Sequence, residues 1–182
     1  MKAKKTTFEN APEGTFPAIV TVAADLGLQQ SDFKGQIKRT HKIGVGFELS
    51  GKQTKEGRPY AVVDQMSLSL HEKAKLYQIA KAALGKVPDE LDPKVLLGKK
   101  VLVSVAHRDH NGRTYANVTN VTGLPDGMKV TSTKTPLLYF DLASPDPKVY
   151  EQLPALFKTL IEKRLQPPAA QPAEELEEDV PF

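Results

Sequence analysis

The stretch from Gln36 to Leu49 constrains the fold most, because its side chains alternate between apolar and polar. The odd positions from Ile43 to Leu49 are apolar, and the even positions Lys38, Lys42 and Glu48 are polar. A period of two is typical of a strand with one face in a core and one face in solvent. Gly44 and Gly46 lie on the polar face, where the missing side chain permits curvature, a bulge or a close ligand.

The remaining elements follow from local signals along the chain. The β-branched run in 16–26 predicts a strand before Gln36–Leu49, and 60–70 predicts a third strand after it. A capping box formed by Ser69 and Glu72 predicts a helix that ends at Gly85. Two further strands are expected over 99–107 and 113–121, joined by a tight turn at Asn111-Gly112. A last helix is expected over 144–164. Pro154 should kink the last helix or mark its true start.

Three strands, a helix and two strands is the element order of the OB fold, a five-stranded Greek-key barrel. We therefore predict a mainly β protein whose OB barrel has its helix between strands three and four. Four regions are expected: a flexible N-terminus, the barrel, an irregular segment whose C-terminal helix packs on the barrel, and a Pro-rich linker with an acidic tail. Their bounds are 1–15, 16–127, 128–165 and 166–182.

The C-terminal tail separates the charges of the chain. Of the 22 acidic residues, five lie in 174–179, and no Lys or Arg follows Arg164. The rest of the chain keeps 17 acidic residues against 25 basic ones, a net charge of +8. The tail is too polar and too short to form a core, so we expect it to be disordered. A basic body with an acidic tail suggests a polyanionic ligand for which the tail competes.

The tail ends on Asp179-Val180-Pro181-Phe182. This ending closely resembles the acidic tip of bacterial single-stranded DNA-binding proteins, which ends Asp-Ile-Pro-Phe and recruits replication and repair enzymes. The resemblance implies partner binding by the tip, through Glu177, Glu178, Asp179, Val180, Pro181 and Phe182.

Short sequence segments that precede the tail are similar to segments of small phage replication proteins that bind single-stranded DNA through an OB fold. The similarity covers roughly 14–127 and includes the phrases 67–73, 96–99 and 112–118. It implies the same fold and ligand. The body does not resemble the classical bacterial protein, so the tetramer of that family is not implied here.

Single strands are bound by cations that follow the backbone and by aromatic rings that stack on bases. The candidates lie on the second strand, around the two hairpin turns and at the start of the third strand. They are Lys34, Lys38, Arg39, Lys42, Arg58, Arg108 and Arg113 among the cations, and Tyr60, Tyr115 and Phe33 among the rings. For Tyr60 and Tyr115 a place in the barrel core is an equal alternative, and Phe47 is interpreted as core.

Signals for catalysis are weak. His107, Asp109 and His110 lie close together without a distant partner for a metal, and Asp64 is a carboxylate among apolar neighbours. No phosphate loop, dinucleotide fingerprint or nucleophile elbow is present, so we predict no catalytic residue, metal or cofactor. The chain has no Cys and no apolar run of membrane-spanning length, which fits a protein of the cytoplasm.

The predicted function is sequence-independent binding and protection of single-stranded DNA in phage replication or recombination, with partner recruitment through the tail. Two alternatives remain open. One is a protein-protein interaction module whose tail only solubilises it, and the other is a metal-dependent DNA-processing enzyme using Asp64 and the histidines. The sequence leaves open the oligomeric state, the preference for DNA over RNA and the length of the binding site.

Overall fold

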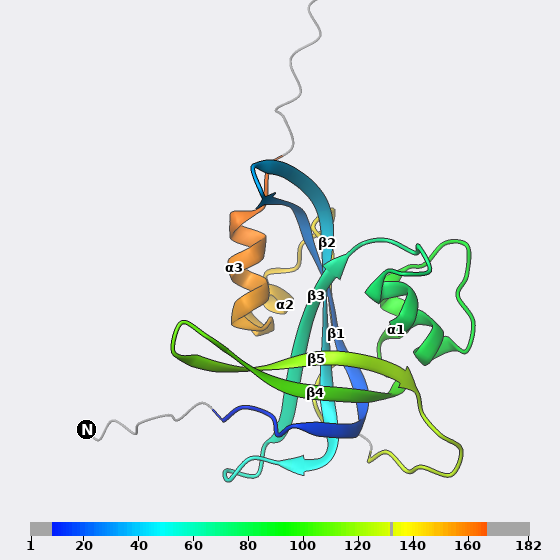
Figure 1. The fold of residues 1–182 in the computed structure, drawn as a ribbon. Coiled ribbons are helices and arrows are strands. Elements are labelled where there is room, and N and C mark those ends of the chain that lie inside the picture. The colour runs from blue at the N-terminus through cyan, green and yellow to red at the C-terminus, as the bar shows by residue number, and fades with distance from the viewer. Residues whose placement is uncertain (1–8, 132, 167–182) are drawn as a thin grey trace, which may run out of the picture.

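A computed structural model describes residues 9–131 and 133–166 of the chain (Figure 1). Six strands lie within these residues: β1 (Gly14–Phe33), β2 (Gln36–Gln53), β3 (Pro59–Ser67), β4 (Lys100–His110), β5 (Arg113–Gly123) and β6 (Leu138–Phe140). The helices are α1 (Lys75–Leu84), α2 (Pro147–Gln152), α3 (Ala155–Lys163) and the 3₁₀ turn η1 (Pro93–Leu96). The predicted order of three strands, a helix and two strands is confirmed.

The strands form one open sheet in the order β3-β2-β1-β4-β5, with all neighbours along this path antiparallel. The short β6 pairs with β1 in parallel, through Val22–Ala24. β3 and β5 lie at the two ends of the path, and no ladder joins them within the described residues. The mainly β class is therefore confirmed, and the sheet that the structure shows is open.

Two hydrophobic cores form on opposite sides of the sheet. The larger one lies under α1 and contains Val45, Phe47 and Leu76. The smaller one lies under α3 and contains Leu26, Phe140 and Phe157. Figure 1 shows α1 and α3 on opposite sides of the strands. Helix α3 therefore packs on the strands of the open sheet.

A β-bulge in β1 lets one strand contribute to both cores. Val20 pairs with Phe47 and is buried in the larger core, whereas Val22 pairs with Gly46 and is buried in the smaller one. The register shifts between these two positions, at Thr21. Residues two apart normally point to the same face, and the extra residue in the bulge places them on opposite faces.

The glycines of β2 lie against the smaller core. A Cβ built on Gly44 would come 2.6 Å from the ring of Phe157, and one on Gly46 would come 3.0 Å from Val22. The expectation of a polar face at both glycines is wrong, because α3 covers that part of the face. The absent side chain of Gly44 makes room for an aromatic ring of the protein itself, and that of Gly46 makes room for Val22.

Local sequence signals correctly predicted the end of α1 and the start of α3, but not the start of α1. Gly85 has a left-handed φ of 77° and its N–H donates to the carbonyl of Lys81 at 2.9 Å, as expected for the end of α1. Pro154 marks the start of α3. The predicted capping box is wrong: α1 begins at Lys75, and the Ser69 hydroxyl instead accepts the N–H of His71 at 3.2 Å in a turn before the helix.

Candidate nucleic-acid interface

The β1–β2 hairpin extends beyond both cores. Lys34 and Gly35 form its turn with φ values of 51° and 78°, which is the backbone of a tight hairpin turn. Lys34, Lys38 and Arg39 are exposed, as are two large apolar side chains: Phe33 is 71% exposed and Ile37 62%. The ammonium of Lys34 lies 5.4 Å from the centre of the Phe33 ring. Cations and an exposed ring are thus presented together on one arm.

The β4–β5 hairpin presents a second set of candidate residues. Asn111 and Gly112 form its turn with φ values of 50° and 72°, as predicted. Arg108 lies directly across the ladder from Tyr115, and Arg113 lies across from His110. Tyr115 is 45% exposed, so its ring is available for stacking. A cation and a ring opposite each other in a ladder have side chains close together on one face.

The N-terminal segment is hydrogen-bonded along this second hairpin, at His107 and at Thr114 beside the turn. Asn10 Nδ2 donates to the carbonyl of Thr114 at 2.6 Å, and His107 Nε2 lies 2.7 Å from the carbonyl of Ala11. The N–H of His107 donates to Glu13 at 2.7 Å. Ala11 is buried in the larger core. The part of the predicted flexible N-terminus that the structure describes therefore packs against the body.

Lys42, Arg58 and Tyr60 have partners within the protein. Lys42 Nζ donates to Gln65 Oε1 at 3.0 Å, Arg58 is paired with Glu56, and the Tyr60 hydroxyl donates to Glu9 Oε2 at 3.0 Å. The hydrogen bond to Glu9 is the main cause of a raised pKa at Tyr60. The Tyr60 ring is half-buried against the larger core, in agreement with the core alternative left open for it.

Among the described residues, the other candidate cations form no ion pair with a carboxylate. Within residues 9–131 and 133–166, the ion pairs are His41–Asp25, Arg58–Glu56 and Lys75–Asp64. None involves Lys34, Lys38, Arg39, Arg108 or Arg113. Unbalanced surface cations are available to neutralise phosphates.

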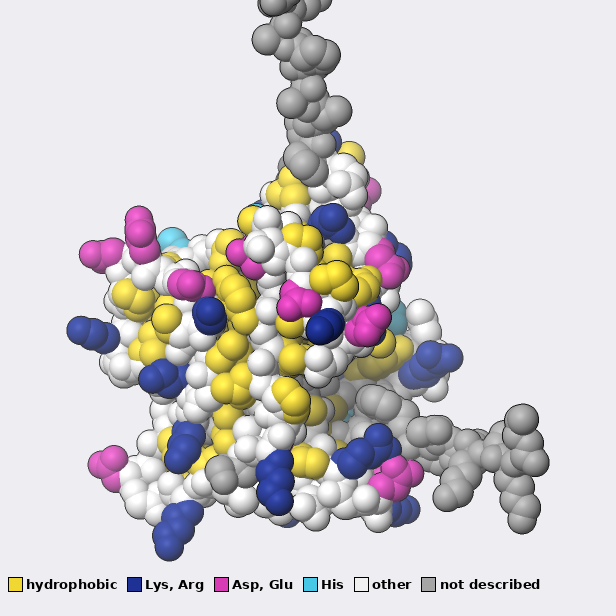
Figure 2. Space-filling view, turned by 180° about the vertical axis from the view of Figure 1, so that it is seen from behind, with side chains coloured by type: hydrophobic (Ala, Val, Ile, Leu, Met, Phe, Trp, Pro, Cys, Tyr) yellow, Lys and Arg dark blue, Asp and Glu magenta, His cyan; other side chains and the backbone are white. Residues whose placement is uncertain are grey.

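The structure does not gather all the candidates into one patch. In Figure 1 the tips of the β1–β2 and β4–β5 hairpins point to different sides of the molecule, and Arg58 lies in the loop at the other end of β2. On the face that Figure 2 shows, Lys and Arg are scattered among other side chains. Lys163 is exposed on α3 and is not among the cations expected from the sequence. No local signal showed that this helix would lie beside the β1–β2 hairpin.

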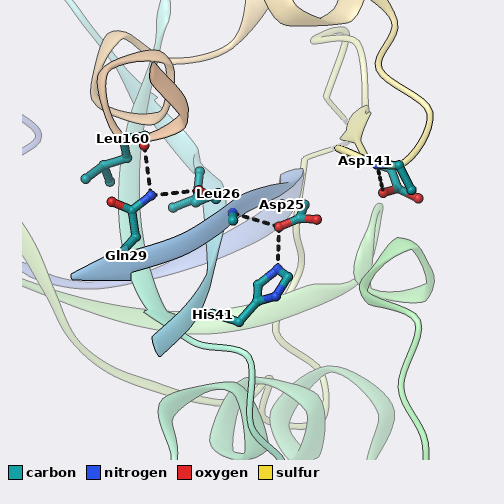
Figure 3. A network of polar contacts seen from close by, with 8 residues as sticks. Asp25, Leu26, Gln29, His41, Asp141 and Leu160 are labelled. Carbon is teal, nitrogen blue, oxygen red and sulfur yellow. Dashed lines mark hydrogen bonds and ion pairs between the residues drawn. The ribbon is translucent and has the colours of Figure 1, made fainter. Parts of the chain in front are cut away.

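Helix α3 is fixed to the base of the β1–β2 hairpin. Gln29 is buried and its Nε2 donates to the carbonyls of Leu26 and Leu160, at 2.7 and 2.8 Å (Figure 3). The N–H of Leu165 donates to the carbonyl of Leu28 at 2.8 Å. The chain therefore leaves the described body next to the cations of this hairpin. The predicted tip residues, 177–182, lie outside the described residues.

Two carboxylates among the groups considered for catalysis interact with side chains of the protein itself. Asp64 pairs with Lys75 at 2.9 Å, and Asp109 accepts the Thr114 hydroxyl at 2.6 Å. No cluster of three potential metal ligands occurs in the part of the chain that the structure describes. Among those same residues no helix has the length and apolarity needed to cross a membrane.

Comparisons with known proteins leave the family open. No protein-family model matches the chain, and no curated protein matches it either.

Proposed function

We propose that this protein binds single-stranded DNA without sequence preference and that its body is an OB-type domain. The strand order supports the fold, because β1 pairs with both β2 and β4, β2 pairs with β3, and α1 follows β3. OB domains bind oligonucleotides through strands two and three and through the loops between strands one and two and between strands four and five. These two loops are the turns of the two cationic hairpins.

The observation that carries the proposal is the pairing of exposed rings with unbalanced cations on both hairpins. Phe33 lies beside Lys34, and Tyr115 lies across from Arg108. Neither ring is part of a core, so folding alone does not account for them. Stacking on a ring tolerates any base, and neutralising phosphates reads no sequence, so the pair favours binding without base preference.

The position of α3 implies a path for the bound DNA strand that differs from the usual groove of an OB domain. In an OB domain the outer face of strands two and three contributes to the groove. Here α3 covers that face at Gly44. We therefore propose a path between the two hairpins along the exposed side of α3, where Lys163 adds a further cation.

The proposal extends to the tail and to the biological setting. The acidic tip would recruit replication or recombination enzymes, and the protein would protect phage DNA in the cytoplasm of the host. No catalytic step, metal or cofactor is part of this function.

The test is a fluorescence anisotropy titration with labelled oligo-dT and with a duplex of equal length. Tight binding of oligo-dT and much weaker binding of duplex are expected, because duplex bases are not free to stack. A mixed-sequence single strand should bind about as well as oligo-dT. Equal affinity for duplex and single strand at moderate salt would refute the proposal. Weak binding of every nucleic acid would favour the interaction module, and Mg²⁺-dependent cleavage would favour the enzyme.

A further inference from the structure

A cavity of about 380 Å³ lies away from both hairpin tips, between α1, η1, β6 and the segment after β3. Its walls are mainly apolar and include Leu68, Leu70, Leu91 and Phe140. Leu68 is 45% exposed at its edge. The cavity, here called the β6 pocket, is large enough for an aromatic side chain and is open to solvent.

The rim of the β6 pocket is acidic. Asp25, Glu90 and Asp141 line it. Asp25 is paired with His41, whose Nε2 lies 2.6 Å from Asp25 Oδ1, and Figure 3 shows this pair and Asp141 near each other. Lys42 also lines the pocket, but its ammonium is bound to Gln65.

Tyr139 in the pocket wall has a pKa that is raised by burial and by nearby carboxylates. Its hydroxyl donates to Asp92 Oδ1 at 3.3 Å. Burial raises the pKa of Tyr139, and the charges of Asp92 and Asp141 raise it further. An apolar cavity with a negative rim is complementary to a segment that carries an aromatic side chain and several lysines.

The two ends of the chain beyond the described residues differ sharply in charge. The C-terminal end carries five carboxylates in 174–179, which the acidic rim would repel. The N-terminal end, residues 1–8, carries Lys2, Lys4 and Lys5, has no acidic residue, and reaches Phe8. Charge therefore selects residues 1–8 as the occupant.

The geometry requires these residues to come from another molecule. Glu9 is bound to Tyr60 near the start of β3, whereas the β6 pocket opens after the end of β3, at Leu68. A strand rises about 3.3 Å per residue, so these two points lie roughly 25 Å apart along β3. Phe8 is adjacent to Glu9, and neighbouring Cα atoms are only about 3.8 Å apart. Phe8 therefore cannot reach the pocket of its own chain.

We propose that the β6 pocket binds residues 1–8 of a second copy of this chain, with Phe8 in the apolar cavity and the lysines against the carboxylates of the rim. The contact joins two different surfaces, the start of β3 with its N-terminal segment on one copy and the β6 pocket on the next. Such a head-to-tail contact repeats, so it produces open chains of molecules or rings. The proposal requires no DNA and is independent of the proposed function.

The first test is sedimentation velocity over a range of protein concentrations, without DNA and at low salt. The intact protein should self-associate, and the double variants Glu90→Lys/Asp141→Lys and Lys4→Glu/Lys5→Glu should each weaken association at least about tenfold. Combining all four substitutions should restore much of it, because opposite charges again face each other. The matched control Asp126→Lys/Glu151→Lys, on exposed acids away from the pocket, should associate like the intact protein.

A second test uses a labelled peptide of residues 1–8 and a protein that lacks them. The peptide should bind the truncated protein, and Phe8→Ala in the peptide or Glu90→Lys/Asp141→Lys in the protein should weaken binding at least about tenfold. A protein that stays monomeric at every concentration overturns the proposal, and so does peptide binding that is indifferent to the rim charges. Circular dichroism of each variant verifies that the fold is retained.

Discussion

Gly44 of β2 lies directly against the ring of Phe157 of α3, so closely that an added Cβ would come 2.6 Å from the ring. Phe157 is fully buried at this contact and belongs to the smaller core. The fit between a missing side chain and a large ring fixes the C-terminal helix on the sheet. It explains the glycine at position 44, whereas the glycine at position 46 makes room for Val22 of β1.

Gly44→Ala should therefore destabilise the protein, because its methyl group overlaps the ring of Phe157 and overpacking typically costs about 1–3 kcal/mol. Chemical denaturation measures the loss. The variant Gly44→Ala/Phe157→Leu should recover part of it, since leucine has no planar ring at this position. Gly112→Ala is unsuitable as a control because of its positive φ. Gly123→Ala is a better one, because its added Cβ would meet only the carbonyl oxygen of Ala82, at 3.7 Å. If Gly44→Ala is as stable as the parent protein, the close contact is not as described.

The two tyrosines near the hairpins should behave differently. Tyr115→Ala should weaken binding of oligo-dT by about 1–3 kcal/mol and leave the melting temperature almost unchanged, because the ring is exposed. Tyr60→Ala should lower the melting temperature, because its ring packs against the larger core and its hydroxyl binds Glu9. Anisotropy titrations and thermal melts on both variants separate the two roles. A stable Tyr60→Ala protein with impaired binding would reverse this assignment.

Removing the cations of the β1–β2 hairpin should change the salt dependence of binding. The triple variant Lys34→Ala/Lys38→Ala/Arg39→Ala should bind more weakly, and the slope of log affinity against log salt should become shallower by about 2, or 0.7 per lost phosphate contact. Stability should change little, because all three side chains are exposed. Lys81→Ala/Lys86→Ala near the end of α1 is the matched control. An unchanged slope in the triple variant would remove this hairpin from the interface.

The acidic tail should compete with DNA. Its anchoring point is favourable, because the N–H of Leu165 binds the carbonyl of Leu28 at the base of the cationic hairpin. Deleting 174–182 should raise the affinity for oligo-dT, most at low salt where charges are least screened.

Deleting Phe182 alone keeps all five acidic side chains, so DNA affinity should stay near the intact value while partner recruitment fails. A pull-down from host lysate with intact protein and both deletions checks recruitment. Recovery of the same proteins with all three forms would reduce the tail to a solubilising appendage.

Tyr139 gives a pH-dependent signal from the β6 pocket. Burial and the nearby Asp92 and Asp141 favour its neutral form, so its pKa is raised in the folded protein. The associated stability is fully present below the unfolded value of about 10 and is lost as the pH rises through the folded pKa. Asp92→Asn/Asp141→Asn should lower the pKa of Tyr139 in an NMR titration of the labelled ring. Asp89→Asn should leave it unchanged, and equal titration curves for all forms would contradict an acidic rim.

Sequence patterns predicted those features that depend on neighbouring residues. The turn at Asn111-Gly112, the helix end at Gly85 and the start of α3 at Pro154 are all set by local backbone preference. Alternation identified β2, since a half-buried strand must repeat every two residues, and a β-branched run identified β1.

Features that depend on distant residues were missed. The C-terminal helix was expected to pack on the barrel, but nothing local indicated that Phe157 would cover Gly44. The bulge at Thr21 has no signature in the sequence, yet it moves Val22 to the other face. The hydrogen bond from Tyr60 to Glu9 joins residues far apart in the chain, so the position of Tyr60 could not be decided from its neighbours.

The central position of β1 has a consequence for the order of folding. This first strand pairs with β2 nearby in sequence, but its ladder with β4 and its contact with α3 require residues that are synthesised much later. Non-local pairing of this kind is slow, because a long loop must close before the contacts form. During translation β1 and β2 would emerge as a hairpin with one glycine-lined face uncovered. That face would stay uncovered until α3, with Phe157, is free to pack on it.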